Sequence, residues 1–281
     1  MGGTITDSLV EIPEEEWIPL SEKFRKEFPS GITACNTLLS SSLNKNKIVD
    51  FPVSVCAPFG NSEYGIVVIW YLTPHATEVG VYSLGTDHSK LVEAILKSGR
   101  LTWSHYVLFG AVMPNLVPAV YSIFNTLGMK MEEDHTHIAY ITKEKALAFD
   151  TEIPSDIRVG PCQLEHCEVM DLVYPHRHPG SLDYFKQMVG WGAGLALQGQ
   201  AGDLRAWVLS GIRGDMHAVQ VLEEQQRKGY AQLLIRTLAK RHAEMNGEVF
   251  GCIIIENEAS KNMFLKMGFE FLDIVTWIWK I

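Results

Sequence analysis

The sequence predicts an α/β protein in which a mixed sheet is flanked by helices and the chain forms two similar halves. Strand-like apolar runs alternate with amphipathic helix-like runs along the 281 residues. Residues 217–241 pass from an extended apolar run through a glycine-containing loop into a helix. A corner with the pattern F-x-x-x-G, at residues 123–129, recurs at residues 263–269, which favours an internal duplication over chance similarity.

In the first half, residues 14–28 are expected to form a helix. Pro13 suits the first turn, the acidic residues 14–16 favour the positive end of the helix dipole, and Pro29 ends the helix. Strands and further helices follow by the period of their apolar residues. The expected strands are residues 51–57, 64–71, 78–84, 104–112 and 136–142, and the expected helices are residues 89–97 and 118–127.

Residues 143–156 contain Pro154 and several charges with little periodicity, which indicates a connection between halves. We therefore divide the chain into domains at residues 1–148 and 149–281. In the second half the expected strands are residues 157–159, 193–198, 204–212, 217–222 and 249–256. The expected helices are residues 165–174 and 182–189. Two more helices are expected, one after the glycine loop and one after residue 257.

The strand-loop-helix segment at residues 217–241 has the features of an anion site. The first amides of a helix lack backbone partners and point along the positive end of its dipole, which favours phosphate. Gly229 removes the side chain where an anion would approach, and Arg227 and Lys228 add positive charge. The loop reads Q-x-x-G-x-A, which is neither a P-loop nor a dinucleotide loop. The structural alternative is a glycine that serves only the turn.

Two motifs resemble those of the GNAT superfamily, the GCN5-related N-acetyltransferases. Residues 226–231 resemble the pyrophosphate loop Q/R-x-x-G-x-G/A of that family, and residues 257–269 resemble its second signature, N-x-x-A/S-x-x-Φ-Φ-x-x-x-G-F, where Φ is apolar. The resemblance implies two tandem GNAT-like halves, with acyl-CoA or acetyl-CoA as co-substrate and no metal. It is good over residues 155–281 and faint over residues 1–145. Chain length and residues 206–216 resemble the glycine N-acyltransferase-like branch.

The resemblance also implies contacts to acyl-CoA. The main chain of Val219, Gln220 and Val221 would bond the pantetheine arm, and donors near Val221 would polarise the thioester carbonyl. Asn257 and Ser260 would touch the cofactor from the far side, although Asn257 equally suits a helix N-cap. The pyrophosphate would bind to the segment formed by Gln226, Arg227, Lys228, Gly229, Tyr230 and Ala231.

The acceptor amine must lose a proton before it attacks the thioester, so a base is expected near this strand. Glu224 is the first candidate, because the glycine N-acyltransferase branch has its proposed catalytic glutamate there, although acidic residues are common at this place in all GNAT proteins. Glu223 is second, and Asp215 and His217 at the start of the strand are alternatives. Phe264 stands where many relatives have a tyrosine that protonates the leaving thiolate, so no acid is assigned.

The first half has the order of a GNAT half without its first elements, and its phosphate loop is missing. Residues 84–89 contain no basic residue and place Asp87 toward the anion position. We expect this half to be a degenerate copy that binds no coenzyme A and shapes the acceptor pocket. His135 and His137 share one strand face, but no carboxylate or cysteine completes a metal site there, so we interpret them as structural histidines.

In the GNAT fold, the acceptor loop joins the first two helices of the domain. Here that loop contains His176, Arg177 and His178. A cation at this place would hold an amino-acid carboxylate, and the planar fork of arginine suits it best. The alternative is a solvated loop whose charges serve solubility.

Composition narrows the possible partners. A formal net charge of −9 argues against nucleic acid. The longest apolar run, residues 65–72, is too short to span a bilayer, and no signal-peptide pattern opens the chain. Residues 1–6 fit a loose myristoylation pattern, but no polybasic patch follows, so stable membrane association is not expected. Five cysteines without a C-x-x-C pair favour the cytoplasm, with mitochondria as the alternative. The oligomeric state is not predicted.

The leading functional hypothesis is an N-acyltransferase that moves an acyl group from acyl-CoA to a small-molecule amine by direct attack in a ternary complex. Glycine or another amino acid is the expected acceptor. A protein acetyltransferase acting on lysine or an N-terminus is a second hypothesis, and it requires an open peptide groove. A non-catalytic acyl-CoA sensor or scaffold is the third, favoured by the missing tyrosine. The motifs set neither the acceptor nor the length of the acyl chain.

Overall fold

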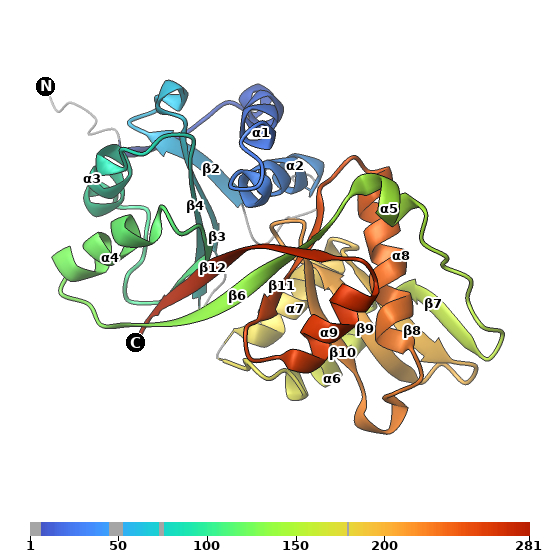
Figure 1. The fold of residues 1–281 in the computed structure, drawn as a ribbon. Coiled ribbons are helices and arrows are strands. Elements are labelled where there is room, and N and C mark those ends of the chain that lie inside the picture. Colours follow the sequence, from blue (N-terminus) through green and yellow to red (C-terminus); the bar gives the residue numbers. More distant parts are fainter. Residues whose placement is uncertain (1–6, 45–52, 73–75, 179) are drawn as a thin grey trace, which may run out of the picture. The chain divides into compact units, whose positions relative to one another are not determined.

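The structure is a computed structural model that describes residues 7–44, 53–72, 76–178 and 180–281 (Figure 1). The myristoylation pattern at residues 1–6 lies outside the described residues. The chain forms two compact units. Unit 1 consists of Met1–Leu38, Asp50–Thr136 and Ile274–Ile281, and unit 2 consists of Leu39–Val49 and His137–Asp273. Among the described residues, no helix has the length and apolar character needed to cross a membrane.

Unit 1 is a mixed sheet with helices packed on it (Figure 1). In chain order its elements are β1 (Leu9–Glu11), η1 (Glu14–Glu16), α1 (Trp17–Arg25), α2 (Ile32–Asn44), β2 (Val53–Pro58), η3 (Ser62–Tyr64), β3 (Ile66–Leu72), β4 (Ala76–Ser83), α3 (Ser89–Lys97), β5 (Tyr106–Val112), α4 (Val117–Thr126) and β6 (Met131–Ile141). Strands β1 to β4 are antiparallel neighbours, and β4 and β5 are parallel.

The first elements of the GNAT-like half are present in unit 1, which corrects the expectation that they are missing. Strand β1 pairs with β2, with Leu9 opposite Pro58, and α2 follows α1. A three-residue strand is too short to show periodicity. Helix α2 is rich in Ser, Thr and Asn, which have low helix propensity, so burial of residues such as Ile32 and Leu38 stabilises it instead.

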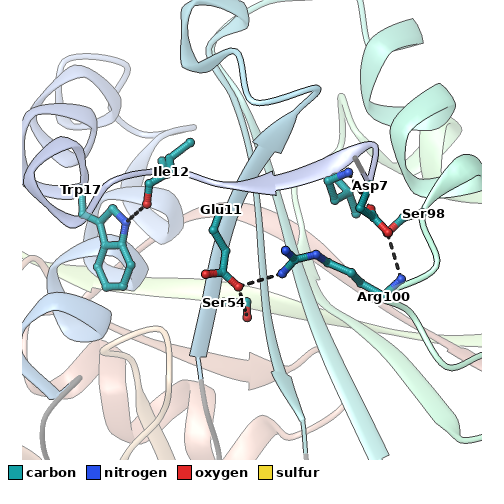
Figure 2. Close-up of polar contacts among 8 residues, drawn as sticks. Asp7, Glu11, Ile12, Trp17, Ser54, Ser98 and Arg100 are labelled. Atoms are coloured by element: carbon teal, nitrogen blue, oxygen red, sulfur yellow. Dashed lines mark hydrogen bonds and ion pairs between the residues drawn. The ribbon is translucent and has the colours of Figure 1, made fainter. Parts of the chain in front are cut away.

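Asp7 fixes the start of β1 to the C-terminal end of α3 (Figure 2). Its carboxylate accepts hydrogen bonds from the amides of Leu9 and Gly99, both at 2.9 Å, and from Ser98 Oγ at 2.7 Å. Burial alone would raise the pKa of Asp7, but these hydrogen bonds outweigh it and lower the pKa. Close by, Arg100 Nη1 lies 2.7 Å from Oε1 of Glu11 (Figure 2).

Unit 2 repeats the order of elements found in unit 1. After the short helix α5 (Lys143–Leu147), its elements are β7 (Ile157–Pro161), η4 (Leu164–His166), α6 (Cys167–Leu172), α7 (Ser181–Gly190), β8 (Gly194–Gly199), β9 (Leu204–Ser210), β10 (Met216–Val221), η5 (Glu223–Gln225), α8 (Tyr230–Glu244), β11 (Val249–Ile254), α9 (Glu258–Lys266) and β12 (Glu270–Lys280). Residues 143–156, expected to be a plain connection, therefore include a helix. The shared order confirms the two tandem halves predicted from the sequence.

The core of unit 2 lies between its sheet and α8. The buried face of α8 contributes Leu234, Ile235 and Leu238, which pack with apolar residues of β8, β9 and β11. This face follows the helical spacing seen in the sequence, so burial of apolar area drives the packing of α8 on the sheet. Helix α8 is thereby held with its N-terminus at the end of β10.

The last strand of each half contributes residues to both units. The strand order is β1-β2-β3-β4-β5-β12 in unit 1 and β6-β11-β10-β9-β8-β7 in unit 2. In unit 1, β12 pairs antiparallel with β5, with Thr276 opposite Val112, and Trp277 Nε1 donates to Thr136 Oγ1 at 2.9 Å. The units are therefore not two consecutive stretches of chain. A division of function between residues 1–148 and 149–281 stays a prediction.

Candidate functional site

Strands β10 and β11 separate almost as soon as they begin. They are parallel, and their register pairs Met216 with Gly251. Gly251 permits this close approach, because a Cβ there would lie 3.1 Å from the carbonyl oxygen of Met216. Within the described residues of the two strands no later pair is registered, and residues 217–221 are half-buried although they lie inside the sheet order. In this described stretch, the main chain of Val219–Val221 therefore has no registered partner on the side of β11.

A β-bulge lies at the point of divergence. Against β9, the register shifts between His217, opposite Leu209, and Gln220, opposite Trp207. Ala218 has a φ of 48°, in the left-handed region that a non-glycine residue adopts only at a cost. A bulge bends its strand and increases the local twist. It thus helps to turn the outer part of β10 away from β11.

The loop after β10 forms an open concavity of amides. Arg227 and Gly229 both have positive φ, of 62° and 81°, and successive turn amides of this kind form a nest for anions. Gly229 is the N-cap of α8, and in this described segment no side chain caps the helix. A Cβ at Gly229 would meet nothing within 4 Å, so the approach to these amides is open. The geometry fits the pyrophosphate group that the sequence motif implies.

The cations near this loop come from the loop itself and from β9. Arg227 and Lys228 lie in the loop itself, and Lys228 Nζ lies 2.9 Å from Oε1 of Gln225. Arg205, on β9, was not singled out from the sequence. Its Nη1 lies 3.5 Å from the hydroxyl of Tyr230, the first residue of α8, and its Nε donates to Asp203 at 2.7 Å. No local pattern links Arg205 to the loop, because the two meet only through the pairing of β9 with β10.

Asp215 and His217 come together at the start of β10. Asp215 is fully buried, with its Oδ2 3.9 Å from Nδ1 of His217 and its Oδ1 3.8 Å from Nε of the buried Arg213. Among the described residues, neither carboxylate oxygen of Asp215 has a hydrogen-bond partner. The side chain of His217 is 19% exposed, and its ring packs edge-on against Tyr184 of α7, with centroids 5.7 Å apart. His217 is therefore the accessible member of this group.

His242 of α8 adds a neutral imidazole to the same buried region. Burial lowers its pKa to about 4, with Arg241 acting in the same direction and the negative charge of Asp215 opposing it. Its Nδ1 has no hydrogen-bond partner among the described residues. Sequence analysis gave no sign of His242, because it occupies an ordinary core position of the helix.

Glu223 and Glu224 lie beyond the strand rather than on it. β10 ends at Val221, and both glutamates belong to the 3-10 turn η5, where the amide of Gln225 donates to the carbonyl of Leu222 at 2.8 Å. Both side chains are exposed. Neither glutamate therefore lies on β10. Glu224 lies beside the amide nest, whereas His217 lies where β10 and β11 diverge.

The second signature spans α9 (Glu258–Lys266), from its N-cap to the residues that follow the helix. Asn257 is its N-cap and accepts a hydrogen bond from the amide of Ser260 at 3.0 Å, so the capping role is present. Both residues keep their cofactor roles as predictions. Phe264 is buried against Phe269, with ring centroids 4.9 Å apart. A core position explains the aromatic residue there, and no proton donor replaces the usual tyrosine at this place.

The acceptor loop between α6 and α7 presents one charged group to solvent. The side chain of Arg177 is 57% exposed, and its Nε lies 2.8 Å from Oδ2 of the buried Asp171. His176 is exposed, and His178 is half-buried. The neighbouring Asp171 and Ser181 were not predicted as functional, because their importance depends on contacts across the loop.

In the first half, Asp87 lies at the start of α3, the helix that corresponds to α8. Its Oδ1 accepts from the amide of Ser89 at 2.9 Å, and this hydrogen bond is the main reason that the pKa of Asp87 is lowered. His135 lies near Glu133 and Thr276, and His137 stacks on Phe271 at 4.8 Å. In the described part of the chain, no group of three or more His, Cys, Asp or Glu residues is placed to hold a metal ion.

Comparisons with known proteins agree with this geometry. Residues 192–278 match the family model described as FR47-like protein. Among curated proteins, none matches the sequence. A solved Drosophila protein is similar over 98% of this chain and 99% of its own, with a TM-score of 0.85 and 18% identity. A tandem GNAT protein from the clavulanic acid biosynthesis pathway is similar over 95% of this chain and 94% of its own, with a TM-score of 0.52 and 12% identity.

The fold is that of the GNAT proteins. A GCN5-related N-acetyltransferase-like protein from Streptococcus suis is also similar, over 96% of this chain and all of its own, with a TM-score of 0.50 and 10% identity. The match to a tandem GNAT protein over nearly the full length agrees with the repeated order of elements in units 1 and 2. In this fold, β10 and β11 are the pair of strands that diverge, and residues 226–231 follow β10.

Proposed function

We propose that the chain is an acyl-CoA-dependent N-acyltransferase whose acceptor is a small-molecule amine, such as glycine or another amino acid. The observation that carries this proposal is the divergence of β10 from β11 directly before an uncapped amide nest. A strand with accessible main chain suits a pantetheine arm, and the nest with its cations suits a pyrophosphate. The glycine N-acyltransferase-like branch remains a proposal that rests on the resemblance of the second half.

Each part of the site has a proposed role. The amides from Gln226 to Ala231 hold the pyrophosphate, and Arg227, Lys228 and Arg205 balance its charge. The main chain of Val219–Val221 binds the pantetheine arm and polarises the thioester carbonyl, because fixed amide dipoles stabilise negative charge developing on the oxygen. The amine nitrogen forms a bond to the carbonyl carbon, the carbon–sulfur bond breaks, and the thiolate takes up a proton.

His217 is the base that the geometry favours, with Glu224 as the alternative. A neutral imidazole takes up a proton near pH 7, and the adjacent Asp215 carboxylate would stabilise the charged ring. His217 also faces α7, which follows the acceptor loop. Asp215 is too buried to meet the amine directly and would act through His217. Glu224 lies at the opposite, phosphate-loop end of β10 and would require a bridging water.

The test is thiol release from acetyl-CoA in the presence of a panel of amines, measured across pH for wild type, His217→Gln, Asp215→Asn and Glu224→Gln. For His217→Gln we expect kcat to fall about 10²–10⁴-fold at low pH, and less at high pH, where the amine loses its proton in solution. Affinity for acetyl-CoA should stay nearly unchanged. Loss of activity in Glu224→Gln alone, with the other two variants unaffected, would identify Glu224 as the base.

The same panel separates the competing functions. Amino acids and other small amines as the best acceptors would support the proposal. Lysine-containing peptides acetylated much faster than every small amine would instead indicate a protein acetyltransferase. Tight acetyl-CoA binding without transfer to any amine would indicate a sensor, for which the buried Phe264 in place of tyrosine already gives a reason.

A further inference from the structure

A buried carboxylate ties together the two ends of the acceptor loop. Asp171 lies near the end of α6 and is only 5% exposed. Its Oδ2 accepts from Nε of Arg177 at 2.8 Å, and its Oδ1 accepts from Oγ of Ser181, the first residue of α7. Burying an ionised carboxylate is costly unless it is paired and hydrogen-bonded. The two contacts together meet that need and fix Arg177 relative to α7.

The backbone of this loop is fixed by further contacts. Ser181 Oγ lies 2.9 Å from the carbonyl oxygen of His178 and 3.3 Å from its amide. The amide of Arg177 donates to the carbonyl of Tyr174 at 3.2 Å. The Tyr174 ring packs edge-on against Phe185 of α7 at 5.1 Å. These contacts hold Arg177 and His178 in place before any ligand arrives, which reduces the entropy cost of binding.

The exposed end of Arg177 remains available for a ligand. A guanidinium has five N–H donors in one plane, and the contact with Asp171 uses the Nε edge. The two terminal nitrogens form a second fork, which matches a carboxylate in a bidentate geometry. Because Asp171 holds the opposite edge, this fork has a defined direction rather than a free swing.

Aromatic contacts connect this loop to the start of β10. Tyr174 packs on Phe185, Phe185 packs on Tyr184 at 6.0 Å, and Tyr184 packs on His217 at 5.7 Å. Helix α7 therefore contacts the loop through Tyr174 and the start of β10 through His217.

We propose that Arg177 is a preformed receptor for a carboxylate on the acceptor and that Asp171 and Ser181 are its positioning residues. The acceptor class is thereby amines that carry a carboxylate, in preference to neutral amines. This inference rests on the proposed function, since it specifies the acceptor of the same site. If the Asp171–Arg177 pair only fastened the loop, its loss would lower stability without distinguishing charged from neutral acceptors.

The test compares glycine with glycinamide, in which a neutral amide replaces the carboxylate. The measured quantity is the ratio of their kcat/KM values in each variant relative to wild type, so that the different basicities of the two amines cancel. For Arg177→Met we expect the ratio to fall by about tenfold or more through KM for glycine, with kcat little changed. Arg177→Lys should restore only part of the preference, because an ammonium has no fork.

Asp171→Asn tests the positioning role separately. The amide keeps a contact for Ser181 but loses the charge that holds Arg177, so we expect a smaller fall of the same ratio. Thermal unfolding of each variant identifies any loss of folding. Arg158→Met, which removes an exposed arginine on β7, is the matched control and should leave the ratio at the wild-type value. An unchanged ratio of kcat/KM for glycine and glycinamide in Arg177→Met would contradict the proposal that Arg177 binds the carboxylate.

A binding measurement separates this inference from the enzyme proposal. N-acetylglycine and N-acetylglycinamide are titrated in the presence of coenzyme A and followed by NMR, with no reaction required. Carboxylate-dependent binding that is lost in Arg177→Met supports the receptor even if no amine is acetylated. Acetyl transfer with equal use of glycine and glycinamide supports the enzyme and overturns the receptor. Equal binding of the two products in wild type also overturns it.

Discussion

The two strand-to-helix corners of this protein share an architecture and differ in what occupies the helix start. In the first half, β4 leads to α3, and the carboxylate of Asp87 bonds the amide of Ser89. In the second half, β10 leads to α8, and Gly229 leaves the helix start without a side-chain cap. A carboxylate of the chain itself thus occupies the place that, in our proposal, a phosphate takes in the other corner.

The two corners also differ in how far the strand before each helix pairs with its parallel neighbour. Strands β4 and β5 are in register over four pairs, from Ala76 with Tyr106 to Val79 with Phe109, whereas β10 and β11 are in register only at Met216 with Gly251. The first corner thus has a longer paired stretch, which ends at Val79, and a carboxylate at its helix start, whereas the second has a single registered pair and no side-chain cap. We expect the second corner, and not the first, to bind an extended, phosphate-bearing ligand.

The largest expected effect comes from placing a carboxylate in the second corner. Gly229→Asp adds negative charge beside the nest and a Cβ at a φ of 81°, which is strained for a non-glycine residue. We expect coenzyme A affinity to fall at least about 100-fold, because charge-assisted hydrogen bonds are each worth about 1.5–3 kcal/mol. Calorimetric titration measures this, with one site per chain expected in wild type.

Gly85→Asp is the matched control in the first corner. A Cβ at Gly85 meets nothing within 4 Å, so the substitution is sterically tolerated. We expect coenzyme A binding to remain at the wild-type level. Two sites per chain in wild type, or equal weakening by both substitutions, would contradict the contrast between the corners.

The second expected effect concerns α8 and α3, the helices that begin at these two corners. Helix α8 buries His242, whereas the buried face of α3 is Leu91, Ala94 and Ile95. The pKa of His242 falls from 6.5 to about 4 on folding, chiefly through burial. Between these pH values the unfolded chain binds the proton and the folded chain does not. Stability contributed by this neutral group is therefore complete above pH 6.5 and is lost progressively as pH falls to about 4.

His242→Leu should remove this acid sensitivity. From the size of the pKa change, we expect wild type to lose about 3 kcal/mol more than the variant between pH 7 and pH 4. Urea unfolding at a series of pH values provides the measurement. His88→Gln, at the exposed start of α3, should follow the wild-type profile, and an identical profile for His242→Leu would show that His242 is not the group concerned.

A smaller effect is expected from the cations of the second corner. Arg227 has a φ of 62°, so Arg227→Gly removes its charge while permitting the same backbone. We expect a weakening of coenzyme A binding of about tenfold, decreasing at high salt, as for a partly exposed charge pair. Lys228→Gln should act in the same direction. Affinity independent of both substitutions and of salt would indicate that the amides alone bind the pyrophosphate.

The smallest effect is expected at the first corner. The hydrogen bond from Ser89 lowers the pKa of Asp87, so the stability that this carboxylate contributes is present at neutral pH and is lost as pH falls through its pKa. Asp87→Asn should slightly lower the urea midpoint at pH 7 and have no effect in strong acid. The variant should gain no coenzyme A site, because residues 84–89 supply no Arg or Lys to balance the charge of a phosphate. A second site in titrations would show that Asp87 alone blocks it.

Sequence predicted the parts of the site whose signals are local. The loop at residues 226–231, the apolar face of α8 and the N-cap Asn257 are encoded by neighbouring residues, and the structure has each of them at the predicted place. Strand β1 and helices α2 and α5 were missed, since they are short or have low helix propensity. The 3-10 turn that contains Glu223 and Glu224 after the end of β10 was also missed.

The remaining features depend on contacts between distant residues. The burial of Asp215 beside Arg213 and the tie between Asp171 and Ser181 arise only when separate elements pack together. The positions of β6 and β12 in the strand order also depend on contacts between distant residues. Apolar periodicity predicts a strand at residues 136–142, most of which lie in β6, but not which neighbour it pairs with, because strand order depends on long-range pairing rather than on local pattern.

The placement of β12 has a consequence for the order in which the protein is made. Residues 274–281 belong to unit 1 and pair with β5, although more than half of the sequence separates them from it. During synthesis, the first unit therefore waits for these residues to leave the ribosome before the strand beside β5 is in place. The second unit needs residues 137–141 of β6, so a gene fragment beginning at residue 149 encodes it without the strand beside β11.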